Sequence, residues 1–121
     1  MLSSLEKVKT ALIGISERVY HFEALDAEAP YIVWAEDNEF NSLAVDEYKA
    51  FQAIEGTIDL YTKGSDDSLI ESIPRALNGA GITWVLNSVQ YEDDTELIHH
   101  EWLFRVRQSW EEESQSQGST S

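Results

Sequence analysis

The clearest pattern in the chain is a strict alternation of residue types close to its C-terminal end. From Ile98 to Val106, apolar, aromatic or histidine residues occupy every second position, and the residues between them are mostly polar. A period of two over nine residues indicates a β-strand with one buried face. The segment that starts at Ile82 has a similar composition, and Glu92-Asp93-Asp94 separates the two segments. We therefore predict a long β-hairpin from Ile82 to Val106 with an acidic tip.

The rest of the chain predicts two helices and three further strands. Apolar residues recur at three- and four-residue spacing over residues 1–18, which indicates an amphipathic helix. Short strands are expected at 19–23 and 31–34, and a longer one at 50–62, where apolar and polar residues alternate. A second helix is expected after Gly64, before the hairpin.

The second helix carries signals for both of its ends. Ser65 or Asp66 is expected to cap its N-terminus, and the run Asn78-Gly79-Ala80-Gly81 predicts its C-terminal stop. Pro74 lies inside the apolar stripe, where a proline costs about 3 kcal/mol or bends the helix. We expect a kink there, or a first helical segment that ends near Ser72.

Two stretches lack the pattern of a helix or a strand. Residues 36–47 are polar and acidic and predict a long loop that partly packs down. Residues 108–121 are rich in Ser, Gln and Glu and predict a disordered acidic tail. The prediction is one α+β domain over residues 1–107, with a mixed or mostly antiparallel sheet of four to five strands and two helices. The order of elements is α-β-β-β-α-β-β.

Charge and composition narrow the classes of function. The chain has 23 acidic and 8 basic residues and a net charge of −15, which argues against nucleic-acid binding through phosphate contacts. It has no cysteine, so disulfides and thiolate metal sites are excluded. No apolar run reaches the roughly 20 residues that span a bilayer, and the N-terminus lacks the pattern of a signal peptide. We expect a protein that folds in a cytoplasm and has no membrane partner.

The three histidines do not form a metal-binding pattern. His99 and His100 are neighbours on one predicted strand, so their side chains point to opposite faces. His21 lies on another strand and could pair with either, but no zinc signature accompanies it. We expect His100 to be a hydrogen-bonded residue among aromatics, His99 to be a surface residue, and no metal or cofactor to be bound.

The carboxylates also have structural explanations. Residues 36–39 lack the ligand spacing of a calcium loop. Residues 66–67 suit a helix cap, and residues 92–94 suit a solvated turn. No glycine-rich phosphate loop and no strained serine turn is present. We therefore predict no catalytic residue and do not expect an enzyme.

Aromatic residues on the predicted strands outnumber what two short helices can cover. One explanation is that they all fill the core, and the other is that some of them meet a second subunit, where Trp and Tyr are favoured. The candidate subunit-interface residues are Trp34, Phe40, Tyr61, Trp84, Tyr91 and Trp102.

Four stretches of the sequence resemble a known group of proteins: Pro30–Trp34, Gly56–Lys63, Trp84–Glu92 and Ile98–Trp102. Their sequences are similar to those of small proteins encoded in the head–tail connection region of long-tailed phages and prophages of Gram-positive bacteria. The chain resembles the tail completion, or tail terminator, proteins of this group. The resemblance covers residues 17–107 and includes no catalytic signature.

This resemblance implies a subunit of a ring, typically a hexamer, that caps the finished tail tube. Such a ring stops polymerisation of the major tail tube protein and presents a surface to the head–tail connector protein. It implies assembly in the host bacterial cytoplasm, and then a place in the virion. DNA would pass through the ring without being bound specifically, and acidic residues could line its lumen. The candidates are Asp37, Glu39, Asp46, Glu47, Glu92, Asp93 and Asp94.

Two other functions stay open at this point. The chain could be a different neck or head-closure protein of the same phages. It could also be an acidic inhibitor that mimics DNA, although its carboxylates cluster in predicted loops and in the tail and do not follow one surface.

Overall fold

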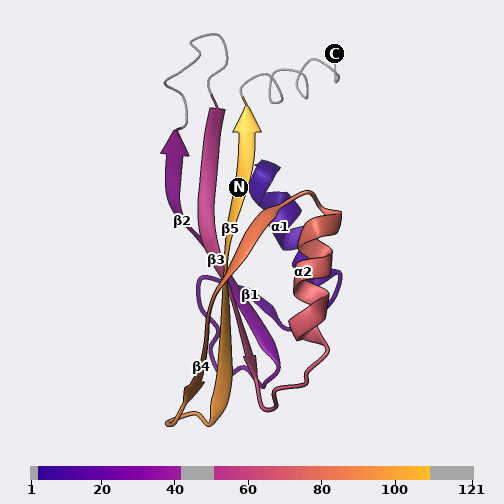
Figure 1. Cartoon of the computed structure of the whole chain (residues 1–121), viewed down its shortest axis with the longest axis vertical. Helices are drawn as coiled ribbons and strands as arrows, with labels where there is room; N and C mark the ends of the chain where they lie inside the picture. The colour runs from indigo at the N-terminus through magenta and orange to yellow at the C-terminus, as the bar shows by residue number, and fades with distance from the viewer. Residues whose placement is uncertain (1–2, 42–50, 110–121) are drawn as a thin grey trace.

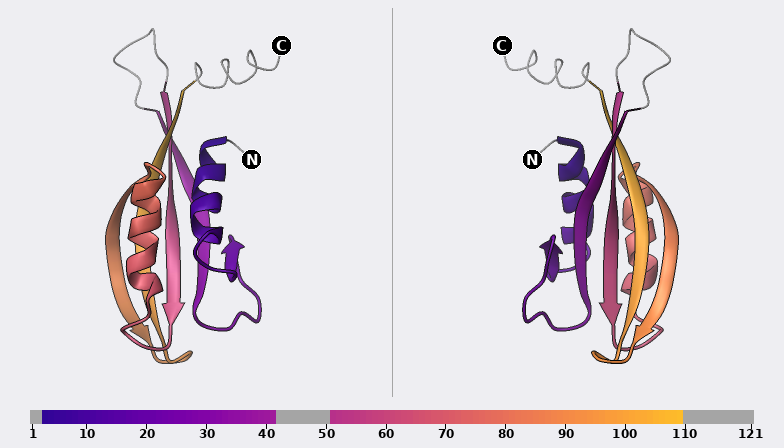
Figure 2. Two further views of the ribbon diagram at one scale, coloured as in Figure 1. Left: turned by 90° about the vertical axis from the view of Figure 1, so that its right-hand side faces the viewer. Right: turned by 90° about the vertical axis from the view of Figure 1, so that its left-hand side faces the viewer.

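The structure, a computed structural model, describes residues 3–41 and 51–109 as a five-stranded sheet with two helices on one of its faces (Figures 1 and 2). The elements are α1 (Ser3–Ile13), β1 (Val19–His21), β2 (Tyr31–Asn41), β3 (Phe51–Thr62), α2 (Leu69–Gly79), β4 (Thr83–Glu92) and β5 (Leu97–Ser109). The predicted α+β class and the order α-β-β-β-α-β-β are confirmed. Within the described residues, no helix is both long enough and apolar enough to cross a membrane.

The sheet is built around the pairing of β3 with β5. The strand order is β1-β2-β3-β5-β4, with β1 parallel to β2 and every other neighbouring pair antiparallel. The two central strands pair along their whole length, from Phe51 opposite Ser109 to Thr62 opposite Ile98. The predicted hairpin is also confirmed, because β4 pairs with β5 from Thr83 opposite Arg105 to Glu92 opposite Leu97.

The core lies between the helices and one face of the sheet. Helix α2 buries Leu69, Ile73 and Leu77, which recur every four residues and therefore lie on one side of the helix. The sheet contributes the alternating residues of β2, β3 and β5 that face the helices. The largest of the buried side chains are Trp34, Trp102, Phe104, Ile58 and Leu60.

Strand β2 is longer than the sequence predicts. It continues to Asn41, so residues 36–41 belong to a strand and not to the expected loop. They pair with β3 across a bulge between Glu36 and Asn38. A backbone next to a long partner strand forms ladder hydrogen bonds whatever its side chains, so polar residues do not prevent pairing. Residues 42–50, the rest of that expected loop, lie outside the described residues.

Strand β5 likewise runs past the predicted end of the domain. It includes Gln108 and Ser109, which pair with Gln52 and Phe51 of β3. The predicted tail therefore begins no earlier than residue 110, and residues 110–121 lie outside the described part of the chain.

Helix α2 begins later than predicted and is not interrupted. Its N-cap is Ser68, and neither Ser65 nor Asp66 takes that position. The carboxylate of Asp67 accepts a hydrogen bond from the backbone N–H of Leu69 at 2.9 Å. The expected end near Ser72 is wrong, because one helix spans Leu69–Gly79 with Pro74 inside it.

The reason for this continuity is the packing of α2 against the sheet. Pro74 removes one backbone donor, while Ile73 before it and Leu77 after it are fully buried on the same face. Burial of this kind outweighs one lost hydrogen bond. The predicted C-terminal stop is confirmed, since Gly81 adopts a φ of +73° and the N–H of Ile82 donates to the carbonyl of Leu77 at 2.9 Å.

One glycine in the centre of the sheet is required by close packing. Gly56 lies opposite Phe104 on β5, and a Cβ at this position would overlap the Phe104 ring and the carbonyl oxygen of Ala35. The aromatic ring thus covers the glycine and fills the space that a side chain would take.

We predict that Gly56→Ala lowers the free energy of unfolding by about 1–3 kcal/mol, because the Phe104 ring or strand β2 must move to admit the methyl group. Urea unfolding measures the change. Gly79→Ala is the matched control, since a Cβ there meets nothing within 4 Å and alanine favours a helix. Equal effects of the two substitutions would contradict the prediction.

Candidate functional site

The face of the sheet opposite the helices is open in the described structure (Figure 2). Rows of side chains cross it in register. The rows are Tyr31, Tyr61 and His99; Val33, Asp59 and Glu101; Ala35, Thr57 and Leu103; and Glu55 with Arg105. Aromatic, acidic and apolar groups therefore follow one another along this face.

An aromatic stack occupies the end of the open face near the β4–β5 turn. The ring centroids of Tyr31 and Tyr61 are 4.7 Å apart, and those of Tyr61 and His99 are 4.4 Å apart. Burial, followed by the charges of Asp59 and Glu92, raises the pKa of Tyr61 to about 12. The hydroxyl group of Tyr61 is thus protonated at neutral pH and is no candidate for a base.

His99 holds two carboxylates with its two ring nitrogens. Its Nε2 lies 2.6 Å from Oδ1 of Asp59, and its Nδ1 lies 3.3 Å from Oε2 of Glu92. His99 lies on the open face of the sheet, as a surface residue would, but the stack and the carboxylates leave only 19% of its side chain exposed.

Of the two carboxyl groups beside His99, that of Asp59 has a shifted pKa. Burial raises the pKa of its carboxyl group, and the hydrogen bond with His99 counteracts only part of that effect. The folded protein therefore retains a proton on Asp59 to a higher pH than the unfolded chain does. Its contribution to stability is fully present at low pH and is lost as the pH rises through this raised pKa.

We predict that Asp59→Asn becomes more stable relative to the wild type as the pH rises from the usual aspartate pKa of 3.8. The gain is about 1.4 kcal/mol for each unit by which the pKa is raised. Urea unfolding at a series of pH values between about 3.5 and 7 measures it. Asp93→Asn, at the exposed hairpin turn, is the control and should show no such trend. A difference that stays constant with pH for Asp59→Asn would disprove the prediction.

His100 lies on the other face, as the alternation predicts. It is 5% exposed, packs beside Trp102 with ring centroids 6.0 Å apart, and its Nδ1 has no hydrogen-bond partner. The prediction of a hydrogen-bonded histidine is confirmed in part, because His100 has a hydrogen bond with the backbone of Leu60 while its Nδ1 has none. Burial lowers the pKa of His100, so the folded protein resists its protonation.

We predict that His100→Leu keeps or raises the free energy of unfolding at pH 7.5, by up to about 2 kcal/mol, because it removes an unsatisfied buried polar atom. The stability that neutral His100 retains is lost as the pH falls below about 6.5 toward the lowered pKa. The variant should therefore lose less stability than the wild type between pH 7.5 and 5. Thermal unfolding at both values tests this, and an equal loss in the two proteins would refute it.

His21 pairs with neither of the other histidines. It lies on β1, where its Nε2 is 2.7 Å from Oε1 of Glu36 and its ring stacks on Trp34 at 4.0 Å between centroids. In the described part of the chain, no three His, Asp or Glu side chains are placed to hold a metal ion together. That the protein binds no metal or cofactor stays a prediction.

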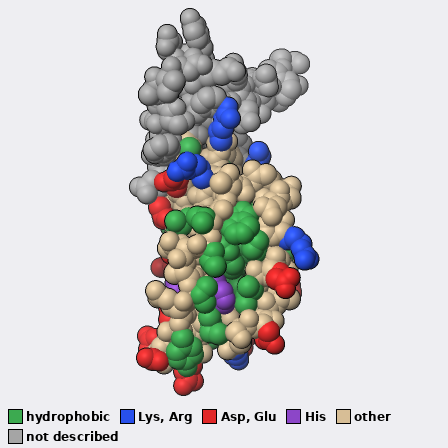
Figure 3. Space-filling view, viewed as in Figure 1, with side chains coloured by type: hydrophobic (Ala, Val, Ile, Leu, Met, Phe, Trp, Pro, Cys, Tyr) green, Lys and Arg blue, Asp and Glu red, His purple; other side chains and the backbone are tan. Residues whose placement is uncertain are grey.

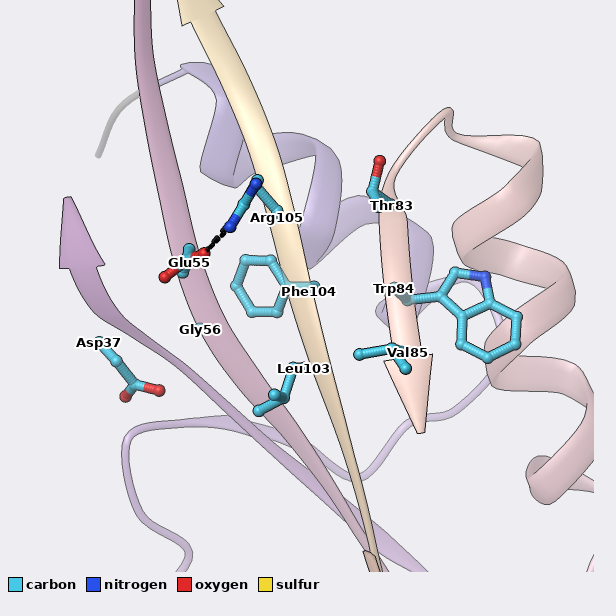
Figure 4. A pocket seen from close by; sticks show the side chains of 9 residues that line it. All are labelled: Asp37, Glu55, Gly56, Thr83, Trp84, Val85, Leu103, Phe104 and Arg105. Atoms are coloured by element: carbon cyan, nitrogen blue, oxygen red, sulfur yellow. Dashed lines mark hydrogen bonds and ion pairs between the residues drawn. The ribbon is translucent and has the colours of Figure 1, made fainter. Parts of the chain in front are cut away.

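A pocket of about 350 Å³ lies on the open face beside β4 (Figure 4). Val85, Leu103 and Phe104 provide its apolar part. Arg105 donates to Glu55 at its rim, and both residues come from the central strands. The lining offers packing area and one ion pair, with no nucleophile beside a general base. An apolar wall with a few polar groups at its rim is the usual composition of a binding pocket.

Strand β4 carries most of the exposed apolar surface because of a bulge. The pairing with β5 shifts between Leu86 and Ser88, so the residues on either side of Asn87 change their alternation. Apolar side chains before and after the bulge consequently lie opposite helix-facing residues of β5. These side chains are Trp84, Leu86, Val89 and Tyr91.

Helix α2 covers only the first of these residues well. Trp84 is partly buried, and its indole N–H donates to Asn78 Oδ1 at 2.8 Å. The following apolar residues of the edge strand are about half exposed or more, as is Val85 on the opposite face. We call the residues Val85, Leu86, Val89 and Tyr91 the β4 patch. Figure 3 shows a band of apolar side chains on this side of the molecule, with acidic side chains at its lower end.

The predicted interface residues have different surroundings. Trp34 and Trp102 are each 2% exposed within a single subunit, so they belong to the core and their assignment to an interface is wrong. The sequence could not show that the helices cover their face of the sheet. Tyr61 lies in the stack on the open face, and Tyr91 is exposed. The side chain of Phe40 lies outside the described residues.

The predicted acidic lumen residues that the structure describes lie in two separate places, on β2 and at the β4–β5 turn. Asp37 on β2 is exposed but is partly desolvated by its neighbours. This desolvation, followed by the charges of Glu101 and Glu36, raises the pKa of its carboxyl group. Glu92, Asp93 and Asp94 lie at the β4–β5 turn, at the other end of the sheet (Figure 1). The remaining candidates, Asp46 and Glu47 and the side chain of Glu39, lie outside the described residues.

Sequence reasoning missed part of the exposed apolar surface. Phe22, Leu25 and Leu103 were not expected there. For the β4 patch a signal exists, because no charged residue occurs between Arg75 and Glu92 in a chain with a net charge of −15. A long stretch without charged residues in such an acidic chain indicates a surface that contacts another protein surface.

Comparisons with known proteins support the fold. No protein-family model and no curated protein matches the chain. Among solved structures, it is similar to a chain of the virion of a native gene transfer agent (GTA) particle. The TM-score is 0.52 at 15% sequence identity, over 86% of this chain and 90% of that chain. The two chains share a fold. At this identity, the likeness shows the fold and not the function.

Proposed function

We propose that this chain is a structural protein of a phage or phage-like virion, and specifically a tail terminator. Copies form a ring on the end of the tail tube, stop its polymerisation and join the tail to the head connector. The observation that carries the proposal is the shared fold with a chain of a virion particle over 86% of this chain. The resemblance of four sequence stretches to tail completion proteins points to the same role.

The surface chemistry supports an assembly role. Among the described residues, two histidines are held by carboxylates: His99 by Asp59 and Glu92, and His21 by Glu36. The surfaces that the described structure offers to other molecules include the β4 patch and the apolar pocket beside it. The function we propose is therefore binding and positioning, without a reaction.

The charge of the chain fits a protein that DNA passes. A net charge of −15 repels the phosphates of DNA, so DNA could pass the protein without binding to it. On the open face of the described sheet, carboxylates alternate with aromatic and apolar rows, and several are paired with His99 or Arg105. This arrangement differs from the continuous row of free charges that DNA mimicry requires. The proposal is accordingly a virion component and not an inhibitor.

We predict that the purified chain shortens tail tubes when it is present while the tube protein polymerises. The expected result is a narrower and shorter length distribution by electron microscopy, because a capped end adds no further subunits. Gold-labelled antibody should mark one end of each tube.

Two controls make this assay specific. Addition after polymerisation is complete should leave tube lengths unchanged, since a cap stops growth and does not sever tubes. Unchanged lengths in the first experiment, together with labelling along the tube walls or none, would reject the terminator role. Binding to the connector alone would instead assign the chain to another position in the neck.

A further inference from the structure

The exposed apolar side chains of the described residues lie mainly at two opposite edges of the sheet. The β4 patch and its neighbour Leu103 lie at one edge. Phe22 and Leu25 follow β1 at the other edge and are 60% and 77% exposed; we call them the β1 patch. Figure 2 shows β4 and β1 on opposite sides of the sheet. Of the large exposed apolar residues, only Ile13 belongs to neither group among those described.

Strand β1, which the β1 patch follows, lies beside the same rows of the sheet as Leu86 and Val89. One continuous row of paired residues runs from one edge to the other, and the row next to it does the same. The first row is Leu86, Trp102, Ile58, Trp34 and His21, and the second is Val89, His100, Leu60, Ile32 and Val19. A second copy displaced sideways by the width of one sheet would therefore bring its β1 edge against Leu86 and Val89.

The charges at the edges disfavour a contact between two β1 patches. The β4 strand is uncharged from Thr83 to Tyr91, whereas the β1 patch has Glu23, Asp26 and Glu28 beside it. Two β1 edges in contact would set acidic groups against each other, which is destabilising. An uncharged edge against an acidic one avoids this repulsion and still buries the apolar groups of both.

We infer that copies of this chain associate head to tail in solution, with the β4 patch of one copy packed on the β1 patch of the next. The contact is heterologous, so each copy retains one free patch of each kind after pairing. Repeated contacts give a closed ring or an open filament. That the outcome is a ring rests on the proposed function; the contact itself does not.

Light scattering or sedimentation over a concentration series tests the contact with the full chain. Val89→Glu and Leu25→Glu should each weaken self-association about 10-fold or more, because each places a charge in the apolar contact. Ile13→Glu is the matched control for Val89→Glu, since both parent side chains are 52% exposed. It should associate like the wild type. Circular dichroism first establishes that each variant is folded.

Mixing distinguishes a head-to-tail contact from a symmetric one. Val89→Glu keeps an intact β1 patch and Leu25→Glu keeps an intact β4 patch, so a 1:1 mixture should form dimers and nothing larger. The chain has no cysteine, which allows a second readout without background. Val89→Cys mixed with Leu25→Cys should form a disulfide-linked pair of the two variants on oxidation.

Several outcomes would overturn the inference. They are a wild type that stays monomeric at about 1 mM, variants that associate like the wild type, or a mixture that stays monomeric. A disulfide that joins Val89→Cys only to itself would show a symmetric β4 contact instead.

Tube assays separate the two proposals. Normal length control by Val89→Glu rejects this contact and leaves the terminator role; self-association without any effect on tubes rejects the terminator role and leaves the contact.

Discussion

Two helices can cover only one face of a five-stranded sheet, and the other features of this molecule depend on that limit. The covered face takes the largest aromatic side chains, including Trp34, Trp102 and Phe104, into a core without solvent. The open face must satisfy its polar groups by pairing them with one another, which it does through His99 and its carboxylates. The edges lie beyond the reach of the helices, and there the apolar side chains stay exposed.

Local periodicity accounts for what the sequence could predict. The alternation in β5 and the three- and four-residue spacing in the helices depend on neighbours in the chain, and the elements they predict are present. Residues 36–41 became a strand because β3 lies beside them, which no local pattern records. The bulge at Asn87 is of the same kind: it moves Val89 and Tyr91 to the side of Leu86, while simple alternation places them on the opposite face.

The candidate site shows the same division between local and long-range information. Adjacent positions on a strand were enough to separate His99 from His100, and the register confirms that they face opposite sides. Which side is the core depends on where the helices dock, so the burial of Trp34 and Trp102 and the unpaired Nδ1 of His100 could not be read from spacing. The strands carry more aromatic residues than two helices can cover, and this correctly predicted an exposed apolar surface. Of the β4 patch, however, it identified only Tyr91.

The direction of the sheet gives an assembly of these subunits a definite geometry. Contacts through the β4 and β1 edges would leave the two ends of the strands free, with the acidic β4–β5 turn at one end and the β2–β3 end at the other. A ring has two unlike faces because every subunit points the same way. Each end of the sheet would then be available to a different partner, tail tube or connector. In the proposed assembly, contacts between two unlike edges would therefore allow one small domain to link two different structures.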